Sequence, residues 1–396
     1  MKSKNKLFIF FAITLLQYLA ANFAHPITPT IIKNLNLKDY MFGLAFAAMS
    51  FTNFLFSPFW GKMRDYYSPR KLLFLGCAGY AVGQFLFSIM KTEGTILIAR
   101  CFSGFFVGAI SVSTLVYIID VSEKEERGKN LATLAIIQSI GAAFGYMIGG
   151  FMGVYSIRLT FAIQSLTLIV SGVLYFLLLQ ENKTEQYETM HTKILFKEAN
   201  PFKSFLGCSV FMTKSFLVLF LVVMFANLGT NAFDQCFNYY LKDQFDFSSA
   251  YNGMLKAIIG IITLVANSTI CMWIMRKKNI KKATSIVLSS CALSIIIMLN
   301  ISDFLPFIIV CIVFFSFNAI YIPLLQDCVA KESTNKNNNL VMGFYNAIKS
   351  LGMIGGALIA GFMYGYGEKI PFVFAGICFV LAAIFLVLNK KISQKA

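Results

Sequence analysis

The chain has 396 residues, of which 58% are hydrophobic and only 13% are charged. A soluble domain carries about 25% charged residues, so this composition excludes an ordinary soluble protein. The formal net charge of +16 would suit a nucleic-acid partner, but the basic residues lie mostly in loops between long apolar runs, which argues against one. The nine cysteines show neither a C-x-x-C pair nor a histidine spacing for zinc, so we expect packing residues and no metal.

Twelve apolar runs are long enough to cross the hydrocarbon core of a bilayer, which takes about 20 residues per helix. A lipid-exposed backbone must bond within its own segment, so each run should be a helix. We therefore predict an all-α polytopic membrane protein with twelve transmembrane helices. The runs are 7–32, 40–60, 72–90, 95–119, 131–154, 159–180, 215–241, 249–275, 283–301, 304–328, 340–366 and 370–389.

The first run follows Lys2, Lys4 and Lys6, as a cleaved signal peptide would, but its apolar stretch is too long for one. We expect a retained first helix. With this end in the cytoplasm, most lysines and arginines fall in inner loops, which is the positive-inside bias of a protein with both termini cytoplasmic. The cations of the outer loops are Lys33, Lys38, Lys91, Arg158, Lys242 and Lys369.

The loop after the second run carries a fixed charge pattern, G-K-M-R-D-Y-Y-S-P-R-K. It resembles the loop signature G-x-x-x-D-(R/K)-x-G-(R/K)-(R/K) of the major facilitator superfamily, although Ser68 replaces the second glycine. The positions that match are Gly61, Asp65, Arg70 and Lys71. The resemblance implies that these residues belong to an inner gate.

The fourth run supports the same resemblance. Arg100 with Gly104 is similar to the R-x-x-x-G element that the superfamily has in this helix. Charge inside a membrane is functional by default, although Arg100 could also serve a structural bond to backbone carbonyls. At the end of this run, Asp120 resembles the acid that pairs in the family with the arginine of the preceding loop, here Arg70. The alternative is a solvated loop whose charges contribute only about 0–1 kcal/mol.

The fifth run contains the glycines Gly141, Gly145, Gly149 and Gly150. They resemble the antiporter signature G-x-x-x-G-P-x-x-G-G, with Tyr146 in place of proline. The resemblance is nearest to the twelve-span drug:proton antiporters and implies export. Tight helix packing would explain the same glycines.

The longest polar stretch, residues 181–214, predicts a cytoplasmic linker between six-helix bundles at 1–180 and 215–396. Internal similarity supports this division, because the segments starting at Gln138 and Lys349 match at a spacing of 211 residues in Ser, Gly, Gly, Ile, Gly, Phe and Met. Transporters built from such repeats hold their site between the two halves.

Five ionisable residues lie well inside the spans: His25, Arg100, Asp234, Lys256 and Lys349. We predict that they line a central cavity and couple transport to protons. Asp234 is the deepest acid and the first candidate for proton binding. His25 is the second, because its ordinary pKa is near 6.5, or else it is a wall residue. We also predict an ion pair between Asp234 and Lys256, which lie at the same depth in the membrane. The pair would either take part in proton coupling or only neutralise two buried charges.

These features predict a secondary active transporter that exports small amphiphilic compounds in exchange for protons. Alternatives are a flippase or exporter for lipids or anionic metabolites, a nutrient symporter of the same fold, and a non-transporting receptor. The sequence has no P-loop and no catalytic motif, so we expect neither an enzyme nor a cofactor. The expected partners are a small molecule, protons and membrane lipid, around a monomer. The Lys-, Asn-, Ile- and Phe-rich composition indicates a bacterial plasma membrane.

Overall fold

A computed structural model describes the helices of the chain and most of its loops. The described residues are 2–64, 66–123, 126–179, 200, 202, 212–275, 279–301, 303–333 and 338–393. Twelve helices within this part of the chain are long and apolar enough to cross a membrane, and none of these residues forms a strand. The predicted all-α fold with twelve spans is therefore confirmed. Most of the predicted linker 181–214 lies outside the described residues.

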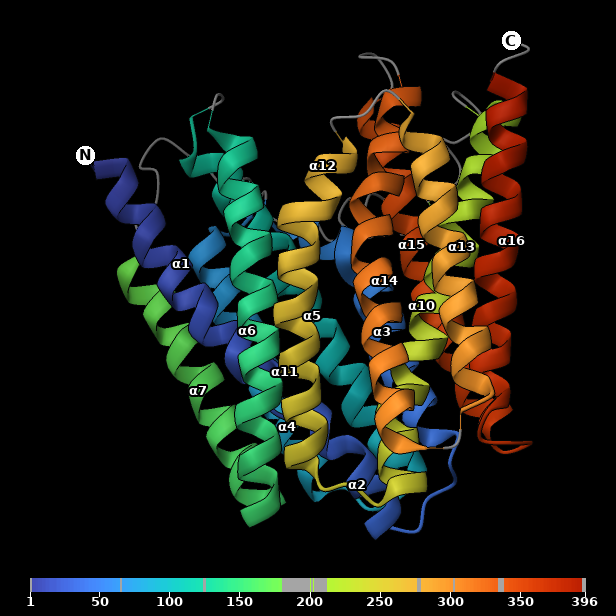
Figure 1. Cartoon of the computed structure of the whole chain (residues 1–396). Helices are drawn as coiled ribbons and strands as arrows, with labels where there is room; N and C mark the ends of the chain where they lie inside the picture. Colours follow the sequence, from blue (N-terminus) through green and yellow to red (C-terminus); the bar gives the residue numbers. More distant parts are fainter. Residues whose placement is uncertain are drawn as a thin grey trace. The chain divides into compact units, whose positions relative to one another are not determined.

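The helices keep the labels of Figure 1. In chain order they are α1 (Lys2–Ala21), η1 (His25–Ile27), α2 (Thr28–Asn34), α3 (Met41–Met63), α4 (Pro69–Ile89), α5 (Glu93–Val121), α6 (Arg127–Tyr155), α7 (Ile157–Leu178), α10 (Lys214–Phe245), α11 (Ser249–Ala266), η3 (Asn267–Cys271), α12 (Met272–Met275), α13 (Ile280–Leu299), α14 (Phe304–Glu332), α15 (Asn338–Tyr364) and α16 (Ile370–Ser393).

The first span is broken where α1 ends and η1 begins, next to Pro26. Proline has no backbone N–H and cannot continue the helical hydrogen bonds. Carbonyl oxygens at the break also bond to side chains of other helices. Gln164 Nε2 of α7 donates to the oxygens of Ala20 and Ala21 at 2.9 and 3.4 Å, and the Tyr80 hydroxyl of α4 donates to Ala21 at 3.2 Å. These side chains stabilise the break, because backbone hydrogen-bonding groups at membrane depth must find partners within the protein.

The contacts divide the chain into two compact units. The first is Met1–Leu37, Ala48–Pro201 and Leu241–Gly260, and the second is Lys38–Ala47, Phe202–Tyr240 and Ile261–Ala396. The start of α3 therefore groups with the second unit and the first part of α11 with the first. For these two segments the division by contacts differs from the predicted division at the linker 181–214. The arrangement as two six-helix bundles stays a prediction of the sequence.

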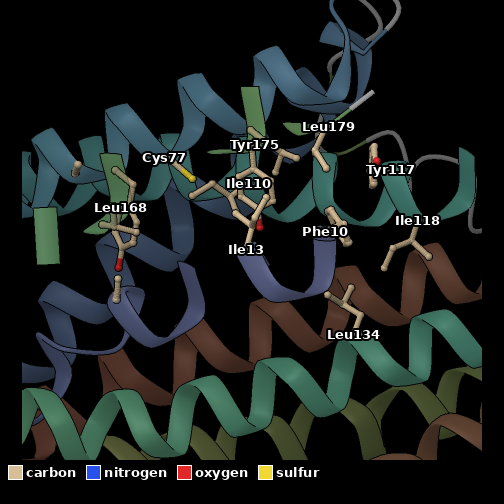
Figure 2. Close-up of a cluster of buried hydrophobic side chains, with 14 of the residues drawn as sticks. Phe10, Ile13, Cys77, Ile110, Tyr117, Ile118, Leu134, Leu168, Tyr175 and Leu179 are labelled. Carbon is tan, nitrogen blue, oxygen red and sulfur yellow. The ribbon is translucent and has the colours of Figure 1, made fainter. Parts of the chain in front are cut away.

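In the first unit, α4 packs on α5 and α7, and α1 packs on α6 and α7. Figure 2 shows the buried cluster that joins these helices, with Phe10 of α1 near Tyr175 of α7. The Tyr175 hydroxyl donates to Thr14 Oγ1 at 2.9 Å, and the Thr14 hydroxyl donates to the Phe10 carbonyl at 2.8 Å. These two hydrogen bonds satisfy the polar atoms of Thr14 and Tyr175 inside the core, as is usual for buried groups.

In the second unit, α13 packs against α14 and α16. An aromatic core fills this unit, and the rings of Phe233 and Phe314 lie 3.8 Å apart between centroids. A polar network closes one end: Lys281 Nζ donates to Glu332 Oε2 at 2.7 Å and to Asn389 Oδ1 at 2.8 Å, and Asn389 Nδ2 donates to the Ser215 carbonyl at 2.8 Å. Four helices, α10, α13, α14 and α16, are joined there.

Candidate functional site

Arg100 of α5 reaches the broken part of the first span. Its Nη2 donates to Thr28 Oγ1 at 3.2 Å, and its Nη1 lies 3.9 Å from Met49 Sδ. The guanidinium carbon lies 3.8 Å from the ring centroid of Phe87, and the residue is only 4% exposed. The cation is therefore held by a hydroxyl, a thioether and an aromatic face.

This environment does not neutralise the charge of Arg100. Among the residues that the structure describes, no carboxylate forms an ion pair with it, and its buried Nε has no hydrogen-bond partner. A cation over an aromatic ring gains about 0.5–2 kcal/mol. Desolvating a charge costs several kcal/mol, so this contact does not offset the burial. Arg100 is thus able to bind an anion, with the Nε–H still available.

His25 lies in η1, three residues before Thr28, and is half-buried. Its ring stacks on Tyr146 of α6, with centroids 5.3 Å apart and planes 9° apart. The residue that replaces proline in the predicted antiporter signature is therefore the stacking partner of the histidine at the break. Arg100 and Tyr146 approach the same interrupted segment from two different helices.

The other predicted cavity residues are half-buried on their helices. Asp234 lies on α10 in the second unit and Lys256 on α11 in the first, and both have interaction partners. The predicted pair of these two residues stays a prediction. Lys349 lies on α15, and within the described part of the chain it has neither a hydrogen-bond nor an ion-pair partner.

The four signature glycines are points of close approach between helices. A Cβ atom at Gly149 would lie 2.2 Å from the Phe23 carbonyl oxygen, and one at Gly150 would lie 2.4 Å from that of Ser249. Gly141 and Gly145 approach α1 in the same way. The clashing atoms belong mostly to backbone, so a side chain could not fit unless a helix moved. Their role in antiport stays a prediction.

The sequence repeat has a structural counterpart. Gly145 approaches the Leu19 carbonyl oxygen of α1, and Gly356, 211 residues later, approaches that of Leu228 in α10. The glycine-rich helix α6 of the first unit therefore packs on α1 in the same register as α15 of the second unit packs on α10. The sequence analysis did not predict that glycines of other helices, Gly43 and Gly253, also take part in this packing.

Two further glycines complete the pattern, one in each unit. The Cβ built at Gly150 would lie 3.1 Å from the Cα of Gly253, and that at Gly361 would lie 3.2 Å from the Cα of Gly43. Gly43 and Gly253 are 210 residues apart, and this spacing is the signal that could have revealed them.

The predicted inner gate is partly rearranged. Asp120 Oδ2 accepts a hydrogen bond from Arg64 Nη2 at 2.7 Å, so the structure pairs Asp120 with Arg64 rather than with Arg70. Arg70 lies in the first turn of α4, and its guanidinium carbon is 5.3 Å from the ring centroid of Phe176 on α7. Arg70 therefore has an aromatic contact with α7, whereas Arg64, which directly follows the end of α3, bonds to Asp120 of α5.

The remaining gate residues have separate positions. Lys71 is exposed. Gly61 has open space where a Cβ would be, so packing does not require glycine at this position. Asp65 lies outside the described residues. A role of these positions in gating stays a prediction.

The chain is similar in sequence to proteins of one transporter family. The profile described as Major Facilitator Superfamily matches residues 10–354. Multidrug resistance protein 2 of Bacillus subtilis (strain 168) is 23% identical over 363 residues, which cover 90% of this chain and 88% of that protein. Quinolone resistance protein NorA of Staphylococcus aureus (strain COL) is 22% identical over 394 residues, covering 98% of this chain and 96% of that protein.

Solved structures share the fold. The human organic anion transporter MFSD10 superposes with a TM-score of 0.70 at 18% identity, over 98% of this chain and 100% of that one. The nucleoside transporter NupG superposes with a TM-score of 0.79 at 15% identity, over 96% of this chain and 99% of that one. At such identities the likeness concerns the fold alone.

Proposed function

The chain belongs to the Major Facilitator Superfamily, and from this premise we propose that it exports small amphiphilic compounds in exchange for protons by alternating access. It is a multi-pass membrane transporter with twelve spans. The direction of transport is supported by relatives that are named for multidrug and quinolone resistance, since resistance of this kind results from removing a compound from the cell.

The observation that carries the proposal is the buried, uncompensated charge of Arg100. Arginine keeps its proton throughout the physiological pH range, so it cannot carry the coupled proton itself. It can hold an anion, either a group of the substrate or a carboxylate that approaches during the cycle. A partner that binds only in part of the cycle would explain why the guanidinium is held by Thr28 and Phe87 with no counter-ion among the described residues.

Asp234 is the proposed proton carrier. A carboxylate within a membrane span can gain and lose a proton when its surroundings change, and intramembrane acids commonly serve in this way. Protonation from the outside would remove the negative charge of Asp234 and favour the state that opens towards the cytoplasm. Deprotonation towards the cytoplasm, coupled to substrate binding, would favour the other. His25 is the second titratable group, at the break of the first span.

We place the protein in a bacterial plasma membrane, as a monomer with both termini in the cytoplasm. The bacterial relatives and the distribution of basic residues support this location and orientation. Transport would draw its energy from the proton gradient, without a cofactor.

The test is transport by the full chain in proteoliposomes with fluorescent amphiphilic cations and anions as a panel. Wild-type protein should concentrate a compound only when a pH gradient is imposed, and should exchange it without a gradient. Arg100→Met should lose both activities, whereas Arg100→Lys should retain part of each because the charge remains. Lys91→Gln is the matched control, since Lys91 is exposed. Transport that ignores the pH gradient, or that moves only lipids, would overturn the proposal.

A further inference from the structure

A pocket of about 450 Å³ lies at one end of the first unit. Its walls come from the end of α2, the turn between α6 and α7, and the segment that joins α10 to α11. In Figure 1 these segments lie at the lower end of α6 and α7, away from the N-terminus. All of its lining residues belong to the first unit.

The lining of this pocket is cationic and rich in hydrogen-bond donors. It contains Arg158 and Lys242, and none of the lining residues is acidic. Thr30, Asn34 and Ser248 add hydroxyl and amide groups. The end of the molecule that carries it is the one predicted to face outward, because Arg158 and Lys242 belong to the sparse cations of the outer loops.

Nearby acids compensate only part of this charge. Lys242 Nζ pairs with Asp246 Oδ1 at 2.5 Å, but the Asp246 side chain is 89% exposed, where such a pair contributes little. The hydrogen bond from Lys242 lowers the pKa of Asp246, which therefore stays ionised. Asp243 is paired with Lys33. Among the described residues, Arg158 has no ion-pair partner, so the excess charge in the pocket is positive.

The start of α7 supplies further donors beside Arg158. Ser156 caps this helix, and its Oγ accepts from the Leu159 N–H at 3.2 Å. The backbone N–H groups of Ile157 and Arg158 have no acceptor within the described part of the chain. Such first-turn groups favour an anion, and here they adjoin a cationic cavity.

An apolar surface continues from the rim of the pocket along α7. Tyr155 is 87% exposed at the rim, and Leu159 and Leu166 of α7 are 54% and 63% exposed. From Leu159 to the end of α7 no residue carries a charge. Exposed apolar residues on a membrane-spanning helix face lipid chains, and tyrosine favours the interface between chains and headgroups.

We propose that this pocket binds the phosphate group of an anionic phospholipid, with Arg158 and Lys242 on the phosphate and the acyl chains along α7. A lipid is favoured over a free phosphate because the cationic pocket and the uncharged lipid-facing surface are continuous. The lining residues include neither Arg100 nor its contacts Thr28, Met49 and Phe87, and the proposal does not depend on the proposed function.

The test is native mass spectrometry of the full chain released from detergent, titrated with phosphatidylglycerol, with diacylglycerol, and with inorganic phosphate. Wild type should retain phosphatidylglycerol and neither of the other probes. A basic residue near an anionic surface contributes about five-fold in affinity, so Arg158→Gln with Lys242→Gln should weaken binding about thirty-fold. Asp246→Asn should strengthen it, because the competing acid is removed. Lys91→Gln, which removes an exposed cation outside the pocket, should bind like wild type.

Three outcomes would contradict a specific phospholipid site. Retention of inorganic phosphate as strongly as of phosphatidylglycerol would replace the lipid site by a free-anion site. Equal retention of diacylglycerol would show that the acyl surface alone binds. Equal loss in the Lys91→Gln variant would show a diffuse effect of charge. Thermal melting in lipid-free detergent should be the same for all variants, and if the double variant melts early, Arg158→Gln alone should still weaken binding about five-fold.

Discussion

Gly253→Ala should weaken the contact between α11 and α6. The Cβ of alanine would lie 2.4 Å from the Tyr146 carbonyl oxygen and 3.2 Å from the Gly150 Cα, whereas ordinary contact begins at 3.4 Å. Backbone atoms cannot rotate away, so the two helices must separate by about 1 Å. The alternating access that we propose would require α6 and α11 to adopt defined packed states, so this displacement should affect both stability and transport.

The magnitude follows from two opposing effects of the substitution. Forcing an extra methyl group into a packed contact costs about 1–3 kcal/mol. Alanine is favoured over glycine within a helix by about 0.5–1 kcal/mol. The net destabilisation of the packed state is therefore about 0–2.5 kcal/mol, which corresponds to a shift of up to about 70-fold in the equilibrium with the separated state.

Gly343→Ala is the matched control, because Gly343 lies within α15 and nothing is within 4 Å of its added Cβ. Thermal melting of the purified protein and the initial transport rate should both fall for Gly253→Ala. For Gly343→Ala, melting should be unchanged or slightly higher. If the two variants melt alike and transport alike, the glycine contact has no special role and the reasoning fails.

Three further predictions concern individual residues. Asp120→Asn removes the ionic partner of Arg64 and should slow transport with little change in substrate affinity, and a collapse of affinity at an unchanged rate would exclude a gate. Asn389→Leu removes buried hydrogen bonds, including the one from Lys281, and should destabilise the second unit by about 1–3 kcal/mol; an unchanged melting temperature would contradict this. Asp234→Asn should retain counterflow and lose pH-driven transport, so full gradient-driven transport by this variant would rule out the proton role.

The spans could be predicted because the bilayer imposes a length and a polarity that a sequence displays directly. Contacts between spans could not, because they depend on how each helix is rotated about its axis. The spacing of 211 residues identified Gly150 and Gly361 as equivalent, but not Gly253 as a partner. The arginine partner of Asp120 could not be predicted either. Arg64 and Arg70 lie close together in the sequence and the family pattern indicated Arg70, whereas the structure pairs Asp120 with Arg64.

The glycine contacts also fix which residues of the two first helices are equivalent. Leu19 and Leu228 meet equivalent glycines and are 209 residues apart, and the same spacing relates His25 to Asp234. By this sequence spacing, corresponding positions carry two different titratable groups, an imidazole at a helix break and a carboxylate within the continuous helix α10. If the two units pack by similar glycine contacts, the packing alone would give the inward-open and outward-open states nearly equal free energies. Different titratable groups at one equivalent position break that balance, so proton binding can select one state in the transport cycle that we propose.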